Sequence, residues 1–134
     1  MHKFSKVTFI GYGLINSSLA HVFKLKTLAK ETTAFSRSKE TREKIKNLNI
    51  VDNVDDNIRE SVKDSDLIVL GVPVGAMESI VSEIGPFLKS GTIITDVGSV
   101  KKHLIDSILP ILPSDVYFVP VSYTHLTLPT ICSV

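Results

Sequence analysis

Short apolar runs and amphipathic stretches alternate along the chain. The apolar runs predict strands near residues 7–10, 32–35, 66–71, 92–97 and 116–119, with a very short strand inside 49–57. Between these runs, apolar residues recur at helical spacing and predict helices near residues 15–28, 39–48, 58–62, 77–84 and 100–109. This alternation favours a doubly wound, mostly parallel Rossmann-type α/β sheet with helices on both faces. Such sheets bind ligands at the carboxyl ends of their strands.

Two features of the pattern predict how these elements pack. The run from Asp66 to Gly71 is apolar at every internal position, which is typical of a strand buried on both faces in a parallel sheet. Gly85-Pro86 and Pro110 are expected to end the fourth and fifth helices. The residues expected to face the sheet from the first two helices are Ile15, Leu19, Val22, Phe23, Ile45 and Leu48.

Length and composition indicate a single-domain soluble protein. The chain has 134 residues, of which 43% are hydrophobic and 22% charged, as in ordinary globular domains. Its longest apolar stretch, residues 67–77, is interrupted by glycine and proline and is shorter than the roughly 20 residues that span a bilayer. Without a membrane span or a secretory signal, a cytoplasmic location is expected. The single cysteine, Cys132, excludes an intrachain disulfide and a cysteine-based metal site, and we expect no metal.

The net charge of +1 hides an asymmetry along the chain. Residues 1–50 carry ten Lys or Arg and three Asp or Glu, which gives +7, whereas residues 51–134 carry five and eleven, which gives −6. The basic half is compatible with an anionic ligand, but solvated helix faces account for most of its lysines. The chain has no dense basic cluster with interleaved aromatic residues, so we do not expect nucleic acid as a partner.

The first predicted strand ends in two glycines one residue apart, and a helix follows them. Gly11 suits a tight turn, Gly13 lets the backbone come close to a pyrophosphate, and the helix presents free N–H groups to that charge. The third position of the G-x-G-x-x-G/A pattern is Asn16, whose side chain must fit against the neighbouring strand. We therefore expect a nucleotide at this turn, held by Gly11, Tyr12, Gly13, Leu14 and Ile15.

The end of the second predicted strand indicates which nucleotide binds. Folds that use NAD place an acidic residue there for the ribose 2′-hydroxyl, about 20 residues after the glycine turn. That place holds Ser36, followed by Arg37 and Ser38, and contains no carboxylate. Because hydroxyl groups and a guanidinium bind a 2′-phosphate, these three residues favour NADP over NAD. The alternative is a polar turn in which Ser38 caps the next helix.

Two further strand ends carry candidate ligand contacts. Val72 and Pro73 follow the fourth strand, where a nicotinamide would lie, although ending the strand and starting the helix explains them equally well. Asp96 ends the fifth strand and begins the segment Asp96-Val97-Gly98-Ser99-Val100-Lys101. This segment is expected to place a glycine, a hydroxyl and a cation at the ligand-facing edge. Ser99 is also a good helix N-cap, and the two roles are compatible.

Taken together, these segments resemble the prephenate/arogenate dehydrogenase family of tyrosine biosynthesis. The resemblance rests on residues 11–20, on residues 66–74, on the distinctive segment 95–101 and on Phe118-Val119-Pro120. It implies an NAD(P)-dependent oxidative decarboxylation, which for prephenate gives 4-hydroxyphenylpyruvate. It also implies that Ser99 is a catalytic residue near the substrate hydroxyl, beside a histidine that takes the hydroxyl proton. In the family a mostly helical C-terminal domain makes a homodimer and binds the substrate carboxylates.

The family pattern stops after Pro120. The expected His-Pro pair is absent, so the catalytic histidine is missing from this chain, and the surroundings of His125 do not match it. Residues 121–134 resemble a translated sequencing adaptor of the transposon type, and the alternative is a divergent final strand. We therefore expect a nucleotide-binding domain over residues 1–120, an artefactual tail over 121–134 and a missing dimerisation domain.

Such a fragment is expected to bind NADP weakly at best and to be inactive alone. Two other functions stay open at this point. The chain is either the cofactor domain of another NADP-dependent reductase or hydroxyacid dehydrogenase, or a regulatory module that binds NADP without chemistry. The other reductases and dehydrogenases are not expected to show the segment from Asp96 to Lys101, and nothing in the sequence requires the regulatory module. The sequence does not choose between prephenate and arogenate as substrate.

Overall fold

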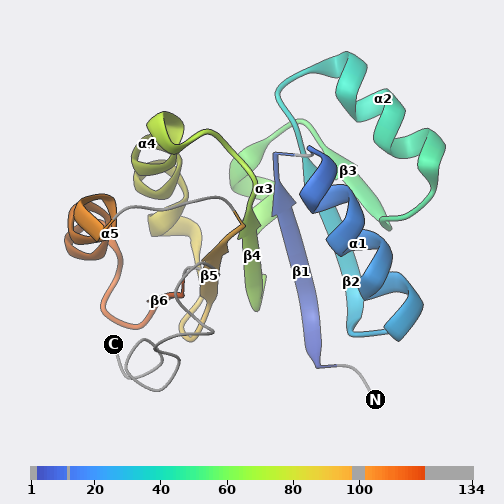
Figure 1. The fold of residues 1–134 in the computed structure, drawn as a ribbon. Coiled ribbons are helices and arrows are strands. Elements are labelled where there is room, and N and C mark those ends of the chain that lie inside the picture. Colours follow the sequence, from blue (N-terminus) through green and yellow to red (C-terminus); the bar gives the residue numbers. More distant parts are fainter. Residues whose placement is uncertain (1–2, 12, 98–101, 120–134) are drawn as a thin grey trace.

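The computed structural model describes residues 3–11, 13–97 and 102–119. Their six strands form one sheet in the order β3-β2-β1-β4-β5-β6, and every neighbouring pair is parallel (Figure 1). The strands are β1 (Phe4–Ile10), β2 (Ala29–Phe35), β3 (Asn53–Asp55), β4 (Leu67–Leu70), β5 (Ile93–Asp96) and β6 (Tyr117–Phe118). This strand order is that of the dinucleotide-binding α/β fold, so the predicted fold class is confirmed.

Helices cover both faces of the sheet (Figure 1). The helix α1 packs on one face, α3, α4 and α5 pack on the other, and α2 lies beside β3 at the sheet edge. The helices are α1 (Leu14–Lys26), α2 (Lys39–Leu48), α3 (Ile58–Val62), α4 (Val74–Ile84) and α5 (Lys102–Ile108), with short 3₁₀ turns η1 (Gly85–Phe87) and η2 (Leu109–Ile111). None of the described helices is long and apolar enough to cross a membrane.

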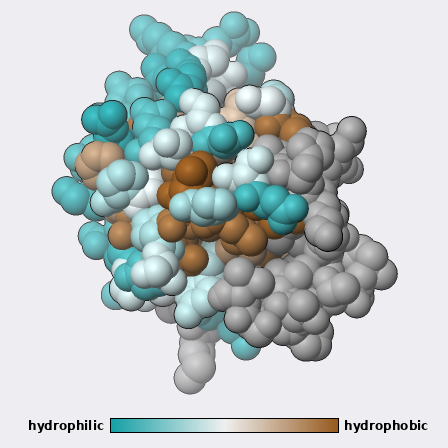
Figure 2. Space-filling view, turned by 90° about the vertical axis from the view of Figure 1, so that its left-hand side faces the viewer, coloured by the Kyte–Doolittle hydropathy of each residue, from teal (hydrophilic) through white to brown (hydrophobic). Residues whose placement is uncertain are grey.

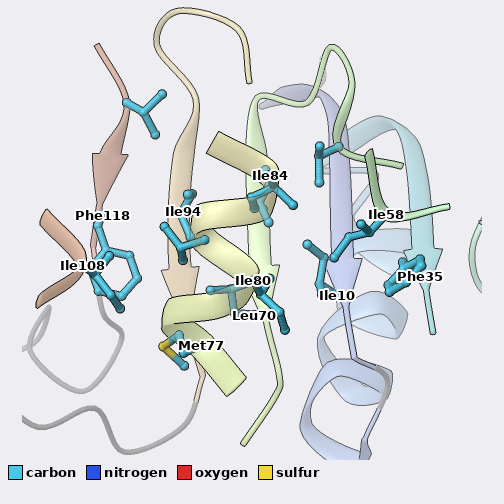
Figure 3. Packing of buried hydrophobic residues seen from close by; sticks show 14 residues of the cluster. Ile10, Phe35, Ile58, Leu70, Met77, Ile80, Ile84, Ile94, Ile108 and Phe118 are labelled. Atoms are coloured by element: carbon cyan, nitrogen blue, oxygen red, sulfur yellow. The ribbon is translucent and has the colours of Figure 1, made fainter. Parts of the chain in front are cut away.

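The strand β4 divides the hydrophobic core into two clusters. Its Ile68 and Leu70 belong to the larger cluster, which includes Met77 of α4 and is shown in Figure 3. Its Leu67 and Val69 belong to the smaller cluster under α1. Side chains of successive strand residues point to opposite faces, so a strand covered on both sides needs apolar residues at every position. The continuous apolar run in the sequence is explained in this way.

Two residues predicted to face the sheet do not. Val22 is 43% exposed and Leu48 is 53% exposed. In α1 the inward stripe runs through Asn16, Leu19, Ala20 and Phe23, and Val22 lies off this stripe at 100° per residue. In α2 only Ile45 is buried, because the neighbouring strand β3 has only three residues and leaves the last turn uncovered.

The side of the molecule formed by α4 and α5 carries hydrophobic residues at its surface. Figure 2 shows this side and the hydrophobic residues that gather near its centre, with hydrophilic residues around part of them. Large hydrophobic residues of this half of the chain that are exposed include Val74, Phe87, Ile111 and Tyr117. In a sheet of this kind ligands bind elsewhere, at the carboxyl ends of the strands.

Asp66 ties the amino end of β4 to two neighbouring segments. Its carboxylate accepts hydrogen bonds from the Ser5 N–H and from the Lys89 ammonium. Partial burial raises the pKa of Asp66, but these two hydrogen bonds and the charge of Lys89 outweigh that effect and lower the pKa below its usual value of 3.8. A carboxyl group with a lowered pKa in the folded state stabilises the fold above its unfolded pKa, and this contribution is lost as the pH falls.

We expect Asp66→Asn to lower the free energy of unfolding at neutral pH. The difference between the wild type and the variant should shrink as the pH falls below about 4, because the wild-type carboxyl is then protonated too. Urea unfolding followed by circular dichroism at several pH values measures this difference. A difference that stays constant from neutral pH to about pH 2 would contradict the assignment of the lowered pKa to folding.

Candidate functional site

The carboxyl ends of the strands bring most of the predicted site residues to one edge of the sheet. In register, Ile10 lies beside Phe35 on one side and beside Leu70 on the other, and Leu70 lies beside Asp96. The chain leaves β1 and β4 toward opposite faces, because α1 covers one face and α4 the other. This is the topological switch point, where open α/β sheets bind their ligands.

Gly11 occupies a position that only glycine fits. Its φ is +77°, in the left-handed region, and a Cβ there would lie 2.6 Å from the carbonyl oxygen of Gly71 and 2.8 Å from Cγ1 of Val72. The Gly11 N–H donates to the Phe35 carbonyl at 3.1 Å, and the Gly71 N–H donates to the Ile10 carbonyl at 2.8 Å. The turn is therefore held against both neighbouring strands.

Gly13 faces open space at the beginning of α1. It is the N-cap residue of this helix, and a Cβ built on it would meet no described atom within 4 Å. The first turn of α1 contains no acidic residue, and the last turn contains Lys24 and Lys26. The free N–H groups at a helix N-terminus attract anions, and the lack of a side chain at Gly13 leaves room for one. Leu14 and Ile15 provide backbone to this turn, and Tyr12 lies outside the described residues.

Asn16 is buried beneath the glycine turn. Only 1% of its surface is exposed, and its Nδ2 donates to the carbonyl oxygens of Gly11 at 2.5 Å, Ile10 at 3.4 Å and Val69 at 3.5 Å. A Cβ on Gly71 would lie 2.5 Å from this nitrogen. The usual glycine pattern has a small residue at this third position. The larger side chain of Asn16 fits here because Gly71, next to the end of β4, has no side chain.

The loop between β2 and α2 is ordered by its own side chains. Ser38 caps α2, because its Oγ accepts the Thr41 N–H at 3.2 Å, so the predicted cap is confirmed, and contact of this loop with NADP stays a prediction. The Oγ of Ser36 accepts the Ser38 N–H at 3.3 Å. The guanidinium of Arg37 lies 5.9 Å from the ring centre of Phe35 and forms an ion pair with Glu83 at 3.3 Å. Beside Arg37 lies a pocket of about 400 Å³ that also borders Asn57.

Two residues that the sequence did not single out support this loop. The Nη1 atom of Arg42 donates to the carbonyl oxygens of Ser36 at 2.8 Å and Arg37 at 3.0 Å. Glu83 comes from α4 and lies 46 residues from its partner Arg37. A pairing over this sequence distance has no signal in a single sequence. Arg42 lies one helical turn after the cap, and this position by itself indicated only a solvated helix face.

The remaining predicted site residues lie at the β4 and β5 ends. Val72 is half-buried against the larger core cluster, and Pro73 is the N-cap residue of α4 with a φ of −57°. Asp96 is fully buried at the last position of β5. Ser99, Lys101 and the segment after Val119 lie outside the described residues. Within residues 3–11, 13–97 and 102–119, no group of three His, Cys, Asp or Glu side chains could hold a metal ion.

A comparison with family models decides the family. Residues 19–122 match the nucleotide-binding domain of prephenate dehydrogenase. The chain belongs to this family. The match begins after the glycine turn, so Gly11 and Gly13 lie outside the matched residues. The prephenate dehydrogenase family was expected from the segments after β1, β4 and β5.

Similar proteins carry the names of this family. The chain is 36% identical over 116 residues to the cyclohexadienyl dehydrogenase of Zymomonas mobilis, covering 87% of this chain and 40% of that protein. The prephenate dehydrogenase of A. aeolicus, solved with hydroxyphenyl propionate and NAD⁺, has a TM-score of 0.76 at 22% identity, covering 85% of this chain and 40% of that one. The Synechocystis arogenate dehydrogenase has a TM-score of 0.70 at 25% identity, covering 79% and 37%. The chain thus spans less than half the length of these relatives.

We expect Gly11→Ala to destabilise the fold by about 2–4 kcal/mol, because a Cβ would be strained at this φ and would overlap Gly71. The matched control is Gly75→Ala in α4, where a Cβ meets no described atom within 4 Å. Alanine also favours a helix there, so the control should be neutral or slightly stabilising. Urea unfolding measures both changes, and equal effects of the two substitutions would contradict the close approach at Gly11.

Proposed function

We propose that this chain is the cofactor-binding domain of a dehydrogenase that oxidatively decarboxylates prephenate or arogenate with NADP. The observation that supports it most is the glycine turn at the switch point of a sheet that belongs to the prephenate dehydrogenase family. The names of the similar proteins agree with both substrates. The chain covers 40% of the Zymomonas relative, so we propose the activity for the whole protein and not for this chain alone.

The described residues fit a dinucleotide. The open space at Gly13, next to the N-terminus of α1, suits the pyrophosphate. The half-buried Val72 and the Pro73 turn border the place of the nicotinamide in our proposal, and Asp96 ends the strand beside it. This arrangement follows the general rule that a dinucleotide lies across the carboxyl edge, with its two halves on either side of the switch point.

The loop after β2 supports NADP as the preferred cofactor. Ser36 and Arg37 stand where folds that use NAD place a carboxylate. Arg37 already has a defined position over Phe35, and Arg42 holds the carbonyl groups of the loop. A guanidinium has five N–H donors, so the contact of its Nη2 with Glu83 leaves donors for a 2′-phosphate.

The chemistry that we propose divides between this domain and the rest of the protein. A cofactor held at the carboxyl edge beside Val72 and Pro73 would supply the hydride acceptor for the substrate carbon that bears the hydroxyl group. Ser99 would hold that hydroxyl group in place, and a histidine outside this chain would take its proton. The carboxylate on the ring then leaves as carbon dioxide. We propose that the whole protein is a cytoplasmic homodimer and that residues 1–134 alone do not turn over substrate.

We expect Arg37→Ala to weaken NADP binding about tenfold or more and to change NAD binding less than about twofold. Charge-assisted hydrogen bonds to a phosphate contribute about 1.5–3 kcal/mol, and only NADP carries the 2′-phosphate. Lys30→Ala removes an exposed cation at the other end of β2 and serves as the matched control. Isothermal titration calorimetry with the 134-residue chain measures the affinities. Equal affinities of the wild type for the two cofactors, or equal losses in the variant, would refute the NADP preference.

We expect Gly13→Ala to weaken the binding of NADP and of NAD to the same extent while the fold remains intact. The Cβ would occupy the space proposed for the pyrophosphate, which both cofactors share. The cost to folding should not exceed about 1 kcal/mol, since alanine is only a poorer N-cap than glycine. Calorimetric titration and thermal unfolding measure the two effects. Unchanged cofactor affinities in a folded variant would place the pyrophosphate elsewhere.

A further inference from the structure

We propose that Asn16 is a positioning residue that fixes the glycine turn, and that Gly71 lacks a side chain in order to admit it. The amide of Asn16 lies between the ends of β1 and β4 and donates to carbonyl groups of both. Its consequence for cofactor binding rests on the proposed function. The interlock itself, which we define as the fit of the Asn16 amide over Gly71, is a property of the folded chain.

The hydrogen bonds show which part of the amide matters. Nδ2 carries two hydrogens and lies nearest to the Gly11 carbonyl, at 2.5 Å. Oδ1 is buried and accepts no hydrogen bond from the residues that the structure describes. A buried acceptor without a partner is destabilising, so an amide that only filled space would be worse than the small residue usual at this position. The donors of Nδ2 are therefore the contribution that Asn16 makes here.

Gly71 is required for space rather than for backbone conformation. A Cβ on Gly71 would lie 2.5 Å from Nδ2, 2.8 Å from Cγ and 3.1 Å from Oδ1 of Asn16, so the whole amide lies across its Cα. The φ of Gly71 is outside the left-handed region, unlike that of Gly11. The three atoms nearest to a Cβ at position 71 all belong to Asn16, so the clash of an alanine there is chiefly with the Asn16 amide. In the usual glycine pattern the small residue lies in the helix, at the position of Asn16, whereas here the residue without a side chain is Gly71, next to the end of β4.

The interlock acts on the turn through the Gly11 carbonyl. This carbonyl belongs to the residue whose φ is +77°, two positions before Gly13. A hydrogen bond from a buried amide holds it in one orientation before any ligand arrives. A turn that is already ordered loses less conformational freedom when a ligand binds, and this raises the affinity for that ligand.

A double-mutant cycle on the 134-residue chain tests the interlock without any cofactor. We expect Gly71→Ala to lower the melting temperature by about 5–15 °C in the wild-type background, because it overfills the core beneath the turn. In the Asn16→Ala background the same change should lower it by less than about 3 °C, since the space is then empty. Additive effects would overturn the interlock. If Gly71→Ala alone does not fold, folding of the double variant still supports it, and failure of both to fold overturns it.

Asn16→Asp separates the donors from the shape of the side chain. Aspartate fills the same space but has no N–H to donate to the three carbonyl groups. We expect it to lower the melting temperature at least as much as Asn16→Ala does. A variant with aspartate that is as stable as the wild type and binds NADP equally well would show that the donors play no part, and would overturn the proposal.

The cofactor measurement distinguishes positioning of the turn from general damage. We expect Asn16→Ala to weaken NADP binding at least about fivefold and to leave the affinity for 2′-AMP unchanged within about twofold, because 2′-AMP has no pyrophosphate. Equal losses for both ligands, or no loss for either, would overturn the positioning role. If the wild type binds neither ligand, the proposed function fails and the positioning role fails with it, whereas the melting cycle still decides the interlock.

Discussion

The close approach of β1 to β4 at Gly11 and Gly71 is the constraint on which the rest of the site depends. The two strands are neighbours in register from Val7 and Leu67 onward, yet their chains must leave toward opposite faces of the sheet. The turn after β1 therefore passes directly over the end of β4, where no side chain fits at Gly11. The same contact places the N-terminus of α1 at the carboxyl edge of the sheet. The free N–H groups of a helix N-terminus stabilise an anionic ligand.

In our proposal, charge and hydrogen bonding around this contact position the two ends of a dinucleotide. The basic first half of the chain contains both the glycine turn and the loop from Ser36 to Ser38. Arg42 and Glu83 hold that loop from different helices, so its cation has a defined place although it is largely exposed. Surface ion pairs contribute little to stability, so we assign the Arg37–Glu83 pair to orientation of the guanidinium.

The sequence was most informative where one residue type satisfies a local requirement. The continuous apolar run of β4, the left-handed turn at Gly11 and the cap at Ser38 each follow from local rules, and each is confirmed. Val22 and Leu48 were placed wrongly, because Val22 lies off the inward stripe of α1 and the short strand β3 leaves the last turn of α2, with Leu48, uncovered. The contact of Asn16 with Val69 of β4 and the pairing of Arg37 with Glu83 of α4 join residues 53 and 46 positions apart, and long-range packing of this kind leaves no pattern in one sequence. The roles of Tyr12 and Ser99 remain predictions.

Amide NMR spectra of the 134-residue chain, recorded during titration with NADP, test the central claim most directly. If the dinucleotide lies across the carboxyl edge, the amide signals of Gly13, Ser36, Arg37 and Val72 should shift together with one saturation curve. The signals of Lys30 and Asn49 serve as controls, because both residues lie beside a pocket at the opposite end of β2 and should not move. Shifts confined to the control residues, or absent from the glycine turn at saturating NADP, would contradict the account.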